Sequence, residues 1–415
     1  MAGPAPLAGL RVIESSILGP AAITTAFADL GAEVIKVETP AGDYIREMTW
    51  PIIQGVSLMH YHLNRGKKSL TLNLKVEAAR EIYRDLVKGA DVVIEASKPG
   101  ALAKYGLGYE DLRKINPKIV FCTVSGYGMT GPYKDMPSHG IAYDTWSGAC
   151  KPAYDEEGFC YIPEHIGVGI SAAPLYGGLA VLAGVLRARA TGQGCFMDLA
   201  QSDAAAAFDW YRSESHMAYA RPEDVVTGNK ADGYERRPVA TAGMKEGVRY
   251  QIYASSDGHV LFMASEQAFW KNFCEGVGRG DLFEKWPGSR YADHARGNRE
   301  LQRELREIFR SRSSAQWMEF GTRVNTPIAP VNTPQNIVDD PQFKARFDLL
   351  PHETHGADML SFPVHFVGEQ LLPPARAPVA GEHTEQVLRE VLGCDDARVA
   401  AIRGSGALGA AAARD

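Results

Sequence analysis

Residues 10–38 read LRVIESSILGPAAITTAFADLGAEVIKVE. The apolar run at 10–14 predicts a buried strand, and the residues after Pro20 predict a helix that stops at Gly31. A second apolar run, 32–38, predicts the next strand. A strand, a short helix and another strand in this order form the βαβ unit of a parallel sheet, so this stretch indicates an α/β protein.

The same alternation continues along the chain. Further strands are predicted at 68–74, 91–95 and 119–125, and helices are predicted at 76–89 and just before Asn116. Strands and helices that alternate in this way pack as a sheet covered by helices. We therefore expect one large α/β domain in the first half of the chain.

A different pattern begins after Arg221. Two short alternating segments, 250–253 and 259–263, flank the turn sequence Ser-Ser-Asp-Gly, which predicts a β-hairpin. Helices are predicted at 266–276 and 298–310. This middle region therefore indicates a small α+β domain.

The length of 415 residues allows two or three domains, at about 150 residues each. We predict a large domain at 1–222, a small domain at 223–330 and a return to the large domain at 331–402. The Gly/Ala-rich tail at 403–415 is predicted to be disordered.

The composition is that of an ordinary globular protein, with 45% hydrophobic and 23% charged residues. A formal net charge of −6 argues against a nucleic-acid partner, which favours a basic excess. The six cysteines are dispersed without a CxxC pair. Dispersed cysteines predict reduced thiols in a cytoplasmic protein and argue against a metal site.

One stretch is long enough to cross a membrane, because 166–186 carries no charged residue. Pro174 and several glycines interrupt it, so we expect a buried helix that follows a loop, and no membrane partner. The N-terminus also lacks the basic region of a secretory signal.

A series of short motifs resembles the class III coenzyme A transferase family, the carnitine and bile-acid type. No single motif is specific, but their order and spacing together are. The motifs lie at 7–14, 19–20, 30–38, 42–43, 67–69, 98–102, 125–128, 131–132, 191–194 and 381–384.

The resemblance implies both a fold and a chemistry. The fold is a large Rossmann-like domain from both chain ends with a small domain from the middle, in two subunits that interlock. Family members move coenzyme A between carboxylic acids, or racemise or isomerise acyl thioesters. In the transferases an aspartate carboxylate attacks the thioester. Coenzyme A thioester is then a substrate, and no permanently bound cofactor is expected.

The nucleophile is the decisive departure from the family pattern. In the family the aspartate follows a glycine upstream of the Thr-Gly-x-Gly turn, and counting back from Thr191 without a gap reaches Gly169 and Ile170. An isoleucine can neither attack a thioester nor accept a proton. We therefore assign no catalytic residue with certainty to this chain.

Three residues are candidates for displaced chemistry. Glu164 is a nearby upstream acid, but its use requires a shift in the alignment. Asp144 also reads as a turn or helix-capping aspartate. His139 resembles an acid/base histidine of the acyl-CoA racemases, but the second group there is the same missing aspartate.

Several residues stand where family members bind coenzyme A. Lysine can pair with its phosphates as a point charge. The candidates are Lys67, Lys68, Ser97, Lys98 and Lys104.

Two hypotheses follow from the resemblance. In the first, this chain is a non-catalytic subunit whose homologous partner supplies the aspartate, as in succinyl-CoA:benzylsuccinate transfer during anaerobic aromatic degradation. The acceptor would be an aromatic or dicarboxylic acid. In the second, the chain is an active homodimeric transferase or isomerase with relocated acid/base residues. The short loop between Glu14 and Gly19, and the charged stretch 230–237 in place of a glycine-rich flap, favour the first.

Overall fold

The computed structural model describes residues 5–96, 100–228, 234, 236, 244–289 and 293–409. It divides into two compact units, the first formed from Met1–Glu214 with Phe347–Asp415 and the second from Ser215–Arg346. Both chain ends therefore contribute to the large unit, as the resemblance implies. The boundaries lie after 214 and 346, whereas the predicted ones lie after 222 and 330. The second boundary is later because the short helices that follow the last strand of the small sheet belong to the small unit. Most of the stretch 230–237 lies outside the described residues.

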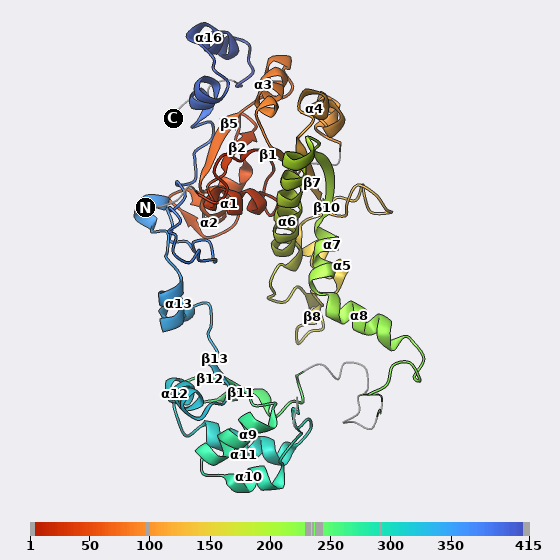
Figure 1. The fold of residues 1–415 in the computed structure, drawn as a ribbon, viewed down its shortest axis with the longest axis vertical. Helices are drawn as coiled ribbons and strands as arrows, with labels where there is room; N and C mark the ends of the chain where they lie inside the picture. Colours follow the sequence, from red (N-terminus) through yellow and green to blue (C-terminus); the bar gives the residue numbers. More distant parts are fainter. Residues whose placement is uncertain are drawn as a thin grey trace. The chain divides into compact units, whose positions relative to one another are not determined.

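A six-stranded parallel sheet forms the centre of the large unit, in the order β10-β7-β6-β1-β2-β5 (Figure 1). Its strands are β1 (Arg11–Ser15), β2 (Glu33–Glu38), β5 (Lys67–Thr71), β6 (Val92–Glu95), β7 (Val120–Ser125) and β10 (Cys195–Ala200). The chain leaves β1 toward β2 on one side and returns to β6 on the other. This reversal between β1 and β6 is the topological switch point of a doubly wound sheet, and it confirms the predicted α/β class.

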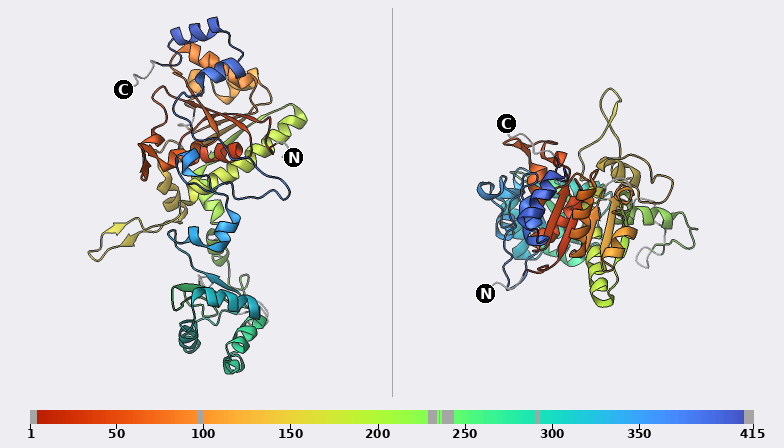
Figure 2. Two further views of the ribbon diagram at one scale, coloured as in Figure 1. Left: turned by 90° about the vertical axis from the view of Figure 1, so that its left-hand side faces the viewer. Right: turned by 90° about the horizontal axis from the view of Figure 1, so that it is seen from above.

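Helices cover both faces of this sheet, and the residue alternation along the strands explains why. Ile13 and Ile35 face a core that includes helix α3 and the C-terminal helices, whereas Val12 and Val34 face α1 and α6. Figure 2 shows these helices on the two sides of the strands. The helices concerned are α1 (Ala21–Asp29), α3 (Glu77–Lys88), α4 (Tyr109–Ile115), α6 (Val168–Thr191), α15 (Thr384–Gln386), η5 (Val387–Val391) and α16 (Asp396–Gly404).

The C-terminal segment is ordered further than predicted. Ala407 is fully buried, and the backbone amide of Asn73 donates to its carbonyl at 2.7 Å. The predicted disordered tail is therefore wrong for residues 403–409, whose apolar contacts the Gly/Ala composition conceals. Residues 410–415 lie outside the described residues.

Helix α6 contains the charge-free stretch, and Pro174 lies within it. Among the described helices it is long and apolar enough to cross a membrane, and 44% of its most apolar window is buried. Val181 and Val185 pack in the core beneath the sheet. Leu175 and Leu179 on the opposite side are exposed. The helix follows a loop, as predicted, but only one of its faces is buried.

The small unit combines a three-stranded antiparallel sheet with four main helices. The order is β11-β12-β13, and the predicted hairpin is β11–β12. The elements are β11 (Tyr250–Ala254), β12 (His259–Met263), β13 (Ile328–Pro330), α9 (Gln267–Gly276), α10 (Gly280–Lys285), α11 (Arg299–Phe309) and α12 (Ser314–Val324). Stacked aromatic rings such as Trp270, Phe273 and Phe309 fill its core.

Short elements complete the chain. These are η1 (Tyr44–Arg46), β3 (Ile52–Ile53), β4 (Val56–Ser57), α2 (Leu58–Asn64), η2 (Ala103–Tyr105), α5 (Gly140–Ser147), β8 (Ala153–Tyr154), β9 (Cys160–Tyr161), α7 (Gln201–Phe208), α8 (Trp210–Tyr219), η4 (Ile337–Asp339), α13 (Pro341–Arg346) and α14 (His352–His355).

Candidate active site

Two pockets adjoin at the carboxyl edge of the large sheet. One, of about 770 Å³, lies at the ends of β1, β2 and β5, and the other, of about 560 Å³, lies at the ends of β1, β6, β7 and β10. We call them the β2 pocket and the β7 pocket. Ile17, Tyr44 and Ala96 line both, so the two form one groove across the switch point. Doubly wound sheets bind their ligands at this place.

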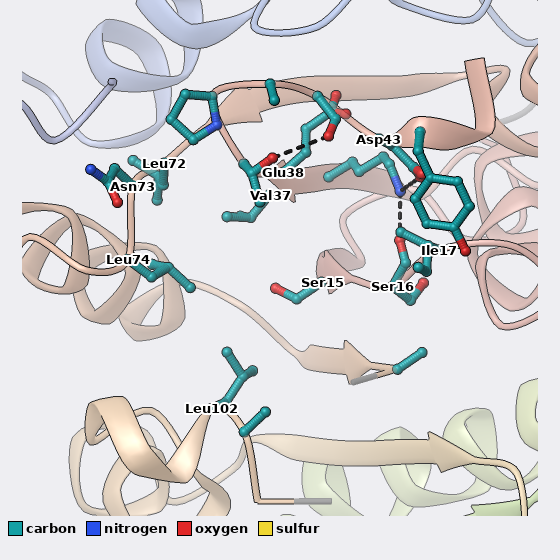
Figure 3. A pocket seen from close by; sticks show the side chains of 18 of the residues that line it. Ser15, Ser16, Ile17, Val37, Glu38, Asp43, Leu72, Asn73, Leu74 and Leu102 are labelled. Carbon is teal, nitrogen blue, oxygen red and sulfur yellow. Dashed lines mark hydrogen bonds and ion pairs between the residues drawn. The ribbon is translucent and has the colours of Figure 1, made fainter. Parts of the chain in front are cut away.

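The β2 pocket has an apolar end and a polar end. Figure 3 shows Leu72, Leu74 and Leu102 at one end, and Ser16 and Asp43 at the other. A pocket of this kind suits a ligand with one flat or apolar part and one charged part.

Beneath the polar end lies a fully buried ionic cluster, which we define as Glu14, Lys36, Asp43 and Lys67. Glu14 contacts the ammonium groups of Lys36 at 3.1 Å and Lys67 at 2.8 Å. Lys36 also lies 3.0 Å from the Asp43 carboxylate. Two carboxylates and two ammonium groups balance in charge, which is the condition under which burial of ions is tolerated.

The cluster shifts the pKa values of its members. Burial by itself would raise the pKa of Glu14, but Lys36 and Lys67 outweigh burial and hold it at about 2. Burial lowers the pKa of Lys67 to about 8, against the opposing attraction of Glu14. Glu14 is therefore ionised at neutral pH, and its carboxylate pairs with Lys36 and Lys67.

Ile170, the residue reached by counting back from Thr191, lies in the β7 pocket. It lies in the first turn of α6, is 38% exposed and lines the pocket. A Cβ added at Gly19 would lie 3.2 Å from the Cβ of Ile170, and one added at Gly140 would lie 2.9 Å from its Cγ2. The glycines on either side therefore leave just enough space for this apolar side chain.

Asp144 is buried, lines neither pocket and caps α6. Its buried carboxylate accepts from the Gly169 backbone amide at 2.7 Å, and its other oxygen lies 3.3 Å from Nε2 of His165. Free amides at a helix N-terminus favour such a carboxylate. The capping interpretation of Asp144 therefore agrees with its contacts, although the helix that it caps is α6 and not its own α5.

The other two candidates differ in position. His139 is exposed at the start of α5 and lines the β7 pocket. Glu164 is exposed in the loop before α6 and lines neither pocket. Of the three candidate residues, the structure brings only His139 to the groove.

The predicted coenzyme A contacts also separate. Lys104 lines the β7 pocket. Lys67 is buried, donating to the carbonyl of Ala21 as well as pairing with Glu14, so we no longer assign it to ligand binding. Lys68 pairs with Glu33 at 2.7 Å, near the amino ends of the strands, and lines neither pocket. Ser97 and Lys98 lie outside the described residues.

Sequence reasoning missed several groove residues. These are Lys75 and Tyr105 in the β2 pocket, and Lys134, Asp135 and Gln201 in the β7 pocket. Lys75 directly follows the predicted strand 68–74, at the edge of the sheet where ligands bind. Gln201 follows β10, which the sequence analysis did not predict. Lys134 and Asp135 come instead from the loop after Gly131-Pro132, which reads as an ordinary turn.

The fold and groove define a doubly wound α/β protein with its ligand site at the switch point. The family model for CoA-transferase family III matches residues 7–384, and the chain belongs to this family. Relatives named as CoA-transferases extend along almost the whole chain, so this protein is a coenzyme A transferase that acts between carboxylic acids.

Three similar proteins illustrate the range. The human succinyl-CoA:glutarate CoA-transferase is 30% identical over 414 residues, covering 97% of this chain and 89% of that protein. Succinyl-CoA:(R)-benzylsuccinate CoA-transferase subunit BbsE of Thauera aromatica is 29% identical over 394 residues, with 88% and 89% covered. A CAIB/BAIF family protein from Brucella suis has a crystal structure that matches at a TM-score of 0.73 with 28% identity, covering 94% of this chain and 100% of that one.

Proposed function

We propose that this chain is the non-catalytic subunit of a heteromeric class III coenzyme A transferase. Its partner is a homologous chain that carries the nucleophilic aspartate. The complex moves coenzyme A from succinyl-CoA to an aromatic or dicarboxylic acid such as benzylsuccinate, in the cytoplasm. The observation that carries the proposal is Ile170, an apolar side chain that lines the reaction groove where the family places a carboxylate.

The surroundings of Ile170 support a non-catalytic role for this chain. The glycines beside it fit its side chain closely, and the neighbouring carboxylate of Asp144 is committed to the Gly169 amide. Moving Asp144 into the groove would leave that amide and His165 without their acceptor, at a cost of about 1–3 kcal/mol. An apolar residue at the helix start, in contrast, lowers the free energy of unfolding only slightly.

The groove still suits coenzyme A. The β2 pocket offers an apolar end for a flat ring system, and Lys75 lines it beside Asn73. Lys104 and Lys134 line the adjoining β7 pocket and supply positive charge toward phosphates or an acid. We therefore propose that this chain binds coenzyme A thioester as a substrate and holds no permanent cofactor.

A partner chain is supported by exposed apolar surface. Along α6, Leu175, Leu179 and Leu186 are exposed on one side of the helix. Surface of this kind marks a protein interface, and we propose that the partner covers it in an interlocked dimer. Two relatives are themselves named as subunits, BbsE and the beta subunit of the Chloroflexus aurantiacus succinyl-CoA–L-malate CoA-transferase.

The alternative function is an active homodimeric transferase or isomerase with displaced acid/base groups. The observation that favours it is that His139 and Asp135 both line the β7 pocket, so titratable groups are present there. This alternative requires that the chain turn over acyl-CoA by itself.

Copurification tests the proposal. The chain is isolated from its natural source at native expression level, and mass spectrometry identifies what accompanies it. The proposal expects a second homologous chain with an intact Gly-Asp motif, and succinyl-CoA transfer that requires both chains. A homodimer that transfers coenzyme A by itself would refute it and establish the alternative.

A further inference from the structure

We propose that Lys36 is a positioning residue for the groove, because one buried ammonium group joins the two loops that form its walls. Lys36 lies on β2, is 1% exposed, and acts through the two loops that it contacts. The inference rests on the proposed function, since it concerns the geometry of the coenzyme A groove.

The first loop, 15–20, follows β1 and lines both pockets. Lys36 Nζ donates to the Ser16 carbonyl at 2.6 Å, where the loop leaves the strand. Two residues further on, Leu18 has a φ of +55°, a conformation that L residues rarely adopt. Such a residue persists only where its surroundings hold it, so the loop depends on fixed anchors.

The second loop, 39–44, follows β2 and lines the β2 pocket. Its anchor is Asp43, whose one carboxylate oxygen lies 3.0 Å from Lys36 Nζ while the other accepts from the Ile45 amide at 3.0 Å. The next residue, Tyr44, lines both pockets. Lys36 therefore holds the start of η1 as well as the first loop, and Figure 3 labels its two loop partners, Ser16 and Asp43, at the polar end of the pocket.

The ammonium group makes three contacts. It donates to the Ser16 carbonyl and to Glu14, which lies at 3.1 Å, and it forms an ion pair with Asp43. Lys67, the other cation of the cluster, differs in this respect. It contacts Glu14, Asn64 and the carbonyl of Ala21, and reaches neither groove loop.

This difference supplies a matched pair of variants. Replacing Lys36 alone would leave Glu14 and Asp43 with one cation, a buried imbalance that endangers folding. The double variant Lys36→Met/Glu14→Gln removes one charge of each sign. Its control, Lys67→Met/Glu14→Gln, removes the same charges from the same cluster but keeps the Lys36 contacts to Ser16 and Asp43.

Two readouts apply to the purified full chain. In hydrogen exchange, peptides covering 15–25 report on the first loop, because the Ala21 and Ala22 amides donate to the carbonyls of Leu18 and Gly19. In calorimetry, free coenzyme A is the probe. We expect Lys36→Met/Glu14→Gln to exchange faster over 15–25 and to bind coenzyme A about tenfold more weakly, from the loss of a charged hydrogen bond. The control loses the Lys67 contact to the Ala21 carbonyl but keeps both loop contacts of Lys36, so it should exchange more slowly over 15–25 than Lys36→Met/Glu14→Gln.

The outcomes separate the two proposals. Equal exchange over 15–25 in the two double variants overturns the positioning role of Lys36, whatever the affinities. If the wild-type chain does not bind coenzyme A, the proposed binding function fails, and the exchange comparison still decides the role of Lys36.

Discussion

The buried carboxylate of Asp144 accepts a hydrogen bond from the backbone amide of Gly169, 2.7 Å away and directly before Ile170. A carboxylate therefore lies at the start of α6, but it is buried, lines neither pocket and caps the helix. The groove side presents Ile170 instead. Asp144 therefore stabilises the start of the helix, whereas Ile170 lines the groove. Each of these two assignments can be tested by substitution.

Ile170 can be shortened without loss of activity in the complex. The substitution Ile170→Ala removes apolar contacts of a partly exposed side chain, so we expect a loss of about 1 kcal/mol in the free energy of unfolding. The transfer rate of the two-chain complex should stay within about twofold of the wild-type rate, because the substitution removes only one weak apolar contact. Steady-state assays and urea unfolding measure the two effects. A large loss of kcat at unchanged stability would contradict a non-catalytic role.

Asp144 should matter for stability and little for turnover. Asp144→Ala leaves the Gly169 amide and His165 without their acceptor, and we expect a loss of about 1–3 kcal/mol in urea unfolding. Asp144→Asn keeps a carbonyl oxygen of the same shape and should lose less. If Asp144→Asn folded normally and yet abolished transfer, Asp144 would be a catalytic group and our assignment would be wrong.

Lys104 and Lys68 should differ in coenzyme A binding. Lys104 lines the β7 pocket, whereas Lys68 pairs with Glu33 outside both pockets. We expect Lys104→Ala to weaken coenzyme A binding about three- to tenfold, from the loss of one charged contact, and Lys68→Ala to leave it unchanged. Calorimetry at two salt concentrations measures both. Equal losses in the two variants would mean that neither lysine contacts the ligand specifically.

Acid should destabilise the large unit through His60. Its Nε2 lies 3.1 Å from the Pro378 carbonyl and its Nδ1 lies 3.0 Å from the Asn64 amide nitrogen, so the neutral ring satisfies both partners. Burial, together with the nearby Arg46, lowers the pKa of His60 to about 4. An unfolded histidine titrates near 6.5, so this contribution is complete above that pH and is lost as the pH falls toward 4.

The size of the effect follows from the same values. A difference of about 2.5 pKa units corresponds to about 3 kcal/mol between pH 7 and pH 4. Urea unfolding of wild type and His60→Gln over this range measures it, because glutamine does not titrate. Parallel pH profiles for the two proteins would show that His60 does not carry the acid sensitivity.

The sheet was predictable because its signal is local. The apolar runs at 10–14 and 32–38 lie next to each other in the chain, and the strands β1, β2, β6 and β7 are buried on both faces. The edge strand β10 has exposed residues on one face and was not predicted. The burial of Lys67 was not predictable, because a lysine that is expected to pair with phosphates is usually solvent-exposed. Its burial depends on Glu14, which a distant strand brings beneath it.

The candidate site was predictable only in part. Counting along the chain singled out Ile170, and the structure places this residue in the groove. The direction in which Asp144 faces depends on how α5 meets the start of α6, and no sequence pattern specifies that contact. Lys134 and Asp135 reach the β7 pocket through a loop path that only the folded chain reveals.

The most direct test of the central claim is to trap the covalent intermediate in the purified two-chain complex. The complex is mixed with succinyl-CoA and quenched with hydroxylamine or borohydride, and each chain is mapped by mass spectrometry. Our account predicts that the modified carboxylate lies on the partner's aspartate, with none on this chain, and that this chain by itself shows neither adduct nor turnover. A trapped carboxylate on this chain, with turnover in the absence of a partner, would contradict it.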